Sequence, residues 1–163
     1  MILGVTGHRP KGLPWGYNEN LQSCKKFKHE LCEYLENLIK GGFNHFIFGL
    51  ALGIDMLFAE IIIKLKEKYD NIILEGAIPC ENQSIKWSQK EKDRYKSIVS
   101  NCDIIRYISK NYTSTCMQER NKYIVDKCDM LLAIWNGKPS GTRNTIHMAQ
   151  SKGCHIKIIN PFA

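Results

Sequence analysis

The sequence of 163 residues predicts an α/β fold, because six short apolar runs alternate with stretches of helical periodicity. This rhythm favours a parallel sheet, since parallel strands need a long crossover and a helix usually provides it. Most of the runs are continuously apolar, which is typical of strands covered by helices on both faces. The predicted architecture is therefore a three-layer Rossmann-like sandwich with a mainly parallel sheet.

The predicted strands end at turns or lead into helical stretches. They occupy residues 2–7, 45–50, 71–78, 103–109, 129–135 and 155–160. In a sheet of this type, ligands bind outside the carboxyl ends of the strands. The loops that follow the strands are therefore the places to look for a site.

The helices between these strands are defined by their apolar stripes and end signals. The first runs from Leu21 to Leu38 and stops at a pair of glycines. The second, about 53–68, is apolar on most sides, which indicates burial against either its own sheet or a partner chain. Three more helices are expected. One lies within 88–101, one begins at Thr115, where TCMQ resembles a capping box, and one runs from Gly141 to Lys152.

Composition argues against several classes of protein. Seven cysteines, an odd number with no CxxC pair, indicate neither a disulfide framework nor a metal site, so a cytoplasmic and reduced chain is expected. No leader or apolar run of transmembrane length is present, so no membrane association is expected. The formal charge of +7 comes largely from lysines scattered among acids, which argues against nucleic acid as a partner. No linker divides the chain, and we expect a single domain over residues 1–163.

The loops after the first two strands carry the first candidate ligand residues. In TGHRP, Gly7 permits close approach of a ligand, and His8 and Arg9 can donate to an anion. The alternative is a polar surface turn. In GLALGID, two glycines bracket the start of a helix whose first turn holds an acid. This acid is suited to accept hydrogen bonds from ribose hydroxyls or to act as a base; the alternative is that it simply interacts favourably with the helix dipole. The candidates here are Gly49, Leu50, Gly53 and Asp55.

The loop after the fifth strand, WNGKPSGTRNT, is the most informative. Glycines and hydroxyl residues surround the expected start of a helix, with two cations nearby, which suits a phosphate. The alternative is an ordinary Ser/Thr N-cap after a glycine turn. Two further polar residues lie near the start of the preceding helix, where the arginine can either reach a ligand or pair with Glu119 or Asp126 on the surface. The candidates are Trp135, Gly137, Ser140, Gly141 and Thr142 in the loop, with Arg120 and Asn121 from the helix.

Taken together, the motifs VTGHRP, GLALGID, ERN before DKCDMLLAIWNG, and SGT resemble the SLOG superfamily. These Rossmann-like domains are shared by the bacterial YpsA-like proteins, the DNA-processing protein DprA and the LOG phosphoribohydrolases that release cytokinins. The YpsA-like branch is most similar, and the resemblance covers nearly the full chain. DprA has further parts for single-stranded DNA that this chain lacks, so the resemblance does not imply DNA binding.

The resemblance to LOG enzymes implies a pocket but not their chemistry. Aligning SGT with the LOG motif PGGxGTxxE places Thr145 where those enzymes carry their catalytic Glu, and threonine does not ionise near neutral pH. What the resemblance implies is phosphate at Gly141 and Thr142, and sugar near Gly53 and Asp55, with no cofactor. Relatives commonly pair, so a homo-oligomer through the apolar second helix is expected.

Two functions follow from these motifs. The first is a binding module that senses or sequesters a nucleotide-derived molecule such as ADP-ribose or a cyclic ADP-ribose. The second is an N-glycosidase or phosphoribohydrolase in which Asp55 stabilises an oxocarbenium-like sugar. A scaffold with a vestigial pocket is a third possibility.

Overall fold

The computed structural model describes all 163 residues, and its six strands form one parallel sheet. The strand order is β4-β3-β2-β1-β5-β6, and every neighbouring pair is parallel. The predicted fold class is confirmed. The strands are β1 (Ile2–Gly7), β2 (His45–Phe48), β3 (Ile73–Cys80), β4 (Ile104–Ser109), β5 (Met130–Ile134) and β6 (His155–Ile159).

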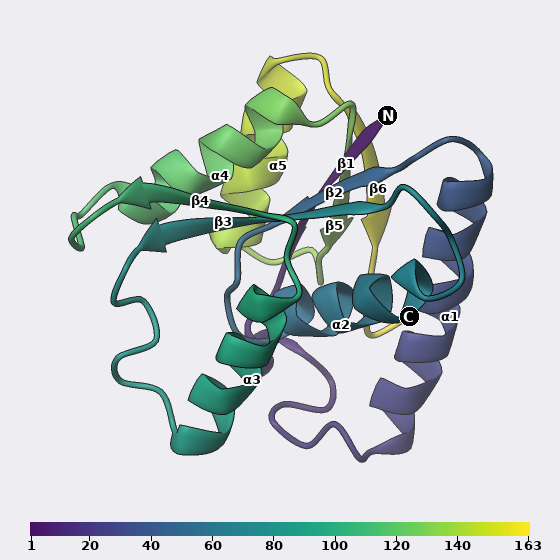
Figure 1. Cartoon of the computed structure of the whole chain (residues 1–163), viewed down its shortest axis with the longest axis horizontal. Helices are drawn as coiled ribbons and strands as arrows, with labels where there is room; N and C mark the ends of the chain where they lie inside the picture. Colours follow the sequence, from purple (N-terminus) through teal and green to yellow (C-terminus); the bar gives the residue numbers. More distant parts are fainter.

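Five α-helices cover the two faces of the sheet (Figure 1). α1, α2 and α3 lie on one face, and α4 and α5 pack together on the other. A short 3-10 helix, η1 (Pro10–Gly12), follows β1. The helices are α1 (Gln22–Lys40), α2 (Ile54–Lys66), α3 (Gln89–Ser100), α4 (Cys116–Lys127) and α5 (Gly141–Ser151), each within a few residues of its prediction.

The apolar second helix is part of the core. α2 packs against β1, β2 and β3 and is flanked by α1 and α3 (Figure 1). Phe58 on this helix is fully buried and lies against Phe46 and Phe48 of β2. Burial inside its own chain therefore accounts for the uniform hydrophobicity of α2, and the expected oligomer interface through this helix loses its basis.

The helix starts differ in how they are capped. Ser88 and Ser140 each accept a hydrogen bond from the backbone N–H three residues on, at 3.2 and 3.3 Å; a cap in the loop of Ser140 was one of the alternatives from the sequence. The capping box expected at Thr115 is absent. The Thr115 hydroxyl donates to the Glu119 carboxylate at 3.3 Å, and its backbone is not in the extended conformation of an N-cap.

A buried polar group lies in the middle of the sheet. Glu75 of β3 is only 4% exposed and contacts His45 at the start of β2 and the hydroxyl of Tyr123 on α4. These contacts satisfy the carboxylate that the packing of α4 against β3 removes from water.

No helix of the protein is long and apolar enough to cross a membrane.

Candidate functional site

The strand order reverses between β1 and β5, and a cavity lies at that point. The chain leaves β1 toward β2 on one side, while β5 and β6 extend the sheet on the other. Crevices at such switch points are where open α/β sheets bind ligands. The cavity has a volume of about 340 Å³ and is lined by the following residues: Val5, Thr6, Gly7, His8, Arg9, Gly12, Gly49, Ala51, Asp55, Met117, Arg120, Asn121, Ile124, Ser140, Gly141 and Thr142.

The structure brings together most of the candidate residues that were predicted from the sequence. Three loops and the start of α4 contribute Gly7, His8, Arg9, Gly49, Asp55, Arg120, Asn121, Ser140, Gly141 and Thr142 to the lining. Leu50, Gly53, Trp135 and Gly137 do not line this cavity.

Each of these four residues has a local structural role instead. Leu50 is fully buried and lies against Gly76 in the core. Gly53 adopts a φ of +93°, and a Cβ there would meet the His8 carbonyl oxygen at 2.4 Å. The Trp135 indole donates to the Lys138 carbonyl at 2.7 Å, and Gly137, at φ +87°, turns the same loop.

Arg120 is the central cation of the cavity. It is only 6% exposed, and its Nη1 donates to the Gly49 carbonyl at 2.5 Å, while its Nε donates to Asn121 at 2.8 Å. The third contact is weak, from Nη2 to the Met117 sulfur at 3.8 Å. A guanidinium has five N–H donors, so Arg120 keeps donors for a ligand. Burial lowers its pKa, and the charge of Asp55 opposes that shift.

Asp55, in the first turn of α2, faces the same cavity. Its carboxylate accepts from the Ala51 backbone N–H at 3.2 Å and forms no direct ion pair with Arg120 or any other cation. Burial raises the pKa of Asp55, and the charge of Arg120 and the amides of Ala51 and Gly49 act in the opposite direction. The cavity thus places the Asp55 carboxyl and the Arg120 guanidinium in one desolvated space with no direct ion pair between them.

His8 connects two of the loops. It is 7% exposed, and its Nε2 accepts a hydrogen bond from the Asn136 backbone N–H at 3.0 Å. Because Nε2 accepts this bond, the ring proton lies on Nδ1, and burial lowers the pKa of His8. His8 therefore joins the β1 and β5 loops through Nε2, and Arg9 is the cation that the β1 loop offers.

The start of α5 offers free backbone amides. The Ser140 hydroxyl is occupied by the Arg143 N–H, whereas the N–H groups of Gly141 and Thr142 have no acceptor in the protein. A Cβ on Gly141 would meet nothing within 4 Å, so the space beside this helix end is open. These amides, with the positive end of the α5 dipole, suit an anion.

Thr145, at the position of the LOG glutamate, takes no part in the cavity. It is 1% exposed, and its hydroxyl donates to the Gly141 carbonyl within α5 at 3.0 Å.

Sequence reasoning missed six lining residues, namely Val5, Thr6, Gly12, Ala51, Met117 and Ile124. The signals for Met117 and Ile124 were available, since they lie three residues before and four after Arg120 and share its helix face.

The fold and the cavity define the class of protein: a Rossmann-like α/β domain with an arginine-centred cavity at the switch point of its sheet. A family model described as the YspA SLOG family matches residues 3–162. This chain belongs to that family, which confirms the resemblance found in the sequence.

Two relatives come from Bacillus species. The UPF0398 protein of Bacillus pumilus is 26% identical over 143 residues, which cover 86% of this chain and 76% of the relative. The SPbeta prophage-derived protein YoqJ of Bacillus subtilis is 30% identical over 138 residues, covering 77% of this chain and 81% of YoqJ.

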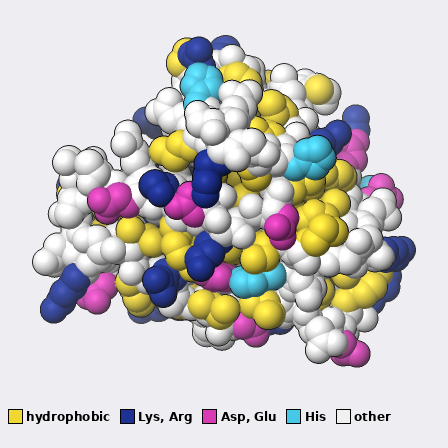
Figure 2. Space-filling view, turned by 90° about the horizontal axis from the view of Figure 1, so that it is seen from above, with side chains coloured by type: hydrophobic (Ala, Val, Ile, Leu, Met, Phe, Trp, Pro, Cys, Tyr) yellow, Lys and Arg dark blue, Asp and Glu magenta, His cyan; other side chains and the backbone are white.

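A solved structure corrects one expectation. DNA processing protein A from Helicobacter pylori, described in its single-stranded DNA binding mode, matches with a TM-score of 0.64 and 16% identity over 97% of this chain. This chain spans 64% of the length of that structure. This likeness overturns the argument that scattered lysines exclude nucleic acid as a partner, because a protein described in its single-stranded DNA binding mode has the same fold. Scattered surface charge, visible as interspersed basic and acidic side chains in Figure 2, does not decide the matter, because single strands are held locally in a groove.

Proposed function

We propose that the cavity binds the phosphate of a nucleotide-derived small molecule, such as ADP-ribose or a cyclic ADP-ribose, which the chain senses or sequesters. The observation that carries this proposal is Arg120, a buried guanidinium that lines the cavity and has no carboxylate bonded to it. Keeping such a charge out of water is costly unless an anion pairs with it. A phosphate supplies that anion and matches the planar donor geometry of arginine.

From the lining residues we propose a position for each part of the ligand. The free amides of Gly141 and Thr142 and the side chains of Arg9 and Arg120 surround the place for phosphate. Asp55, an acceptor that would repel phosphate, is suited to the hydroxyls of the sugar. Gly53 does not line the cavity, so we propose that the sugar lies beside Asp55 alone.

Calorimetry with ADP-ribose tests the phosphate position. Gly141→Leu places a bulky side chain in the open space beside the α5 amides and should abolish measurable binding. Asn144→Leu, at an exposed position on the same helix that does not line the cavity, is the matched control and should bind as the unaltered protein does. Equal affinity in the Gly141 variant would overturn the proposed phosphate position.

Single-stranded DNA is a second candidate, favoured by the likeness to the Helicobacter protein. Its phosphates would use the same cations, Arg9 and Arg120. Fluorescence anisotropy with a labelled oligothymidine, repeated with excess ADP-ribose, distinguishes the two candidates. If DNA is the ligand, affinity should fall steeply with salt and exceed the affinity for ADP-ribose. Failure of the oligonucleotide to bind would exclude this candidate.

An N-glycosidase is favoured by one observation, namely that the buried carboxyl of Asp55 lines the cavity. Such an enzyme would use Asp55 to stabilise the positive charge that develops on the sugar. Asp55→Asn should then preserve binding and lower turnover by about 100-fold or more. Equal rates of base release in the two proteins would contradict the assignment. The absence of an acid at Thr145 leads us to place binding ahead of hydrolysis.

A further inference from the structure

A second, smaller cleft shares Arg9 with the cavity. It has a volume of about 260 Å³ and is lined by Arg9, Pro10, Lys11, Tyr17, Leu52 and Trp87, which we call the aromatic cleft. Arg9 lines both spaces, so the two are adjacent at the end of β1. Arg9 therefore lies at the boundary of the cavity and the aromatic cleft.

Two aromatic rings form walls of this cleft. Tyr17 is 65% exposed, a large fraction for a side chain of its size, and Trp87 is partly buried. Trp87 is supported by Tyr95 of α3 in an edge-to-face contact with ring centroids 5.5 Å apart and planes at 82°. This contact holds the indole in place while leaving part of it accessible in the cleft.

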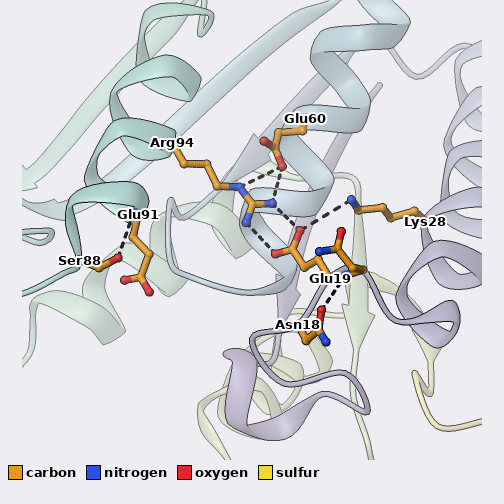
Figure 3. Close-up of polar contacts among 8 residues, drawn as sticks. Asn18, Glu19, Lys28, Glu60, Ser88, Glu91 and Arg94 are labelled. Carbon is orange, nitrogen blue, oxygen red and sulfur yellow. Dashed lines mark hydrogen bonds and ion pairs between the residues drawn. The ribbon is translucent and has the colours of Figure 1, made fainter.

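The segment that carries Tyr17 is anchored by an ion-pair network (Figure 3). Arg94 of α3 donates to both oxygens of Glu19 at 2.7 and 3.0 Å, and also to Glu60 of α2 at 2.5 and 3.1 Å. Lys28 of α1 lies 3.7 Å from the Glu19 carboxylate. The loop is thereby tied to three helices two residues beyond Tyr17, which limits how far the ring can move.

The charges around the aromatic cleft select its occupant. No carboxylate lines this cleft itself, and both Arg9 and Lys11 line it and would repel an ammonium group drawn to the aromatic rings. Flat aromatic groups attached to an anion fit both features, because the rings stack on Tyr17 and Trp87 while the cations attract the negative charge.

We propose that the aromatic cleft is the nucleobase subsite of the ligand whose phosphate occupies the cavity. This inference rests on the proposed function. The volume of the cleft lies below the roughly 300–1,000 Å³ of pockets for drug-sized ligands, which fits one base rather than a whole nucleotide. The ligand class is therefore narrowed to nucleotides whose base is free to enter the aromatic cleft.

Two probes separate this proposal from the phosphate site: AMP, which has a base, and ribose 5-phosphate, which lacks one. We expect the unaltered protein to bind AMP at least tenfold more tightly than ribose 5-phosphate. Tyr17→Ala should weaken the binding of AMP by about tenfold or more and leave the affinity for ribose 5-phosphate unchanged. Tyr112→Ala is the matched control, since Tyr112 is also 65% exposed but lines neither space.

Trp87 gives an independent readout. Trp87→Phe keeps a ring in the contact with Tyr95 and should remove the quenching of tryptophan fluorescence that AMP is expected to cause in the unaltered protein. Equal affinity for AMP and ribose 5-phosphate, or an AMP affinity that survives Tyr17→Ala, would overturn the base subsite while leaving the phosphate site intact. If neither probe binds the unaltered protein, both the subsite and the proposed function fail.

Discussion

The guanidinium of Arg120 lies directly over the backbone of Gly49. Its Nη1 donates to the Gly49 carbonyl at 2.5 Å, and a Cβ added to Gly49 would lie 2.4 Å from that same nitrogen. Glycine at the end of β2 therefore leaves the space in which α4 places its buried arginine. The two motifs GLALGID and ERN, about 70 residues apart in the sequence, meet at this contact.

Gly49→Ala should displace the Arg120 guanidinium. The clash costs about 1–3 kcal/mol of unfolding free energy, as overpacking of a buried site usually does, and moves the donors away from the ligand. Urea unfolding measures the first effect and calorimetry with ADP-ribose the second. Gly41→Ala is the control, because its Cβ would meet backbone atoms only at 3.4 Å. Unchanged stability and affinity in the Gly49 variant would show that the Arg120 guanidinium can move aside without losing its contacts, which would contradict the prediction.

Arg120→Gln should lower phosphate affinity more than it lowers stability. The amide can still donate to the Gly49 carbonyl, but it carries no charge, and a hydrogen bond to a charged group contributes about 1.5–3 kcal/mol. We expect ADP-ribose to bind roughly 10- to 150-fold more weakly by calorimetry. Arg143→Gln, at an exposed position that does not line the cavity, should change affinity far less.

The pKa of Asp55 predicts a pH dependence of stability. Because burial raises this pKa above 3.8, the folded chain holds a proton in a pH range where the unfolded chain has lost it. Stability from this group is complete below pH 3.8 and is lost as pH rises through the folded pKa, by at most about 1.4 kcal/mol per pH unit.

Asp55→Asn removes this proton and isolates its effect. The unfolding free energy of the variant minus that of the unaltered protein should increase with pH above 3.8 and then level off. Denaturant unfolding at a series of pH values measures the difference. Parallel curves for the two proteins would show that the Asp55 pKa is the same in the folded and unfolded chains.

Arg94→Lys tests the anchor of the loop that carries Tyr17. A lysine cannot hold two carboxylates with the forked geometry of arginine, so the segment before α1 should open more often. We expect faster chymotrypsin cleavage after the exposed Tyr17 and a loss of about 1 kcal/mol or less, since the network is partly exposed. An unchanged cleavage rate would show that the packing of Trp15 against Phe27 alone holds the loop.

The sequence predicted the fold well because its signals are local. Apolar strands such as β5 and glycine stops such as the one after α1 depend on periodicity and backbone freedom, which the residues display directly. The cavity loops were located because parallel strands place their carboxyl ends together. The resemblance to a known family added an expectation of which part of a ligand each loop holds.

The remaining features depend on packing that the sequence does not display. Thr115 has the residue type of a cap, yet its hydroxyl binds Glu119 instead. Trp135 and Gly137 lie in the right loop, but the loop folds onto itself through the Trp135 indole. The distribution of lysines along the sequence was also a poor guide to ligands. It does not reveal that Arg9 and Arg120, from different elements, line the same cavity.

The central claim is that the Arg120 cavity holds a nucleotide-derived ligand. The most direct measurement incubates the protein and its Arg120→Gln variant with NAD, ADP-ribose, cyclic ADP-ribose and AMP, removes free ligand, denatures the protein and identifies what is released by liquid chromatography and mass spectrometry. We expect an intact nucleotide with the unaltered protein and little with the variant. Release of nothing, or of equal amounts from both proteins, would contradict the claim.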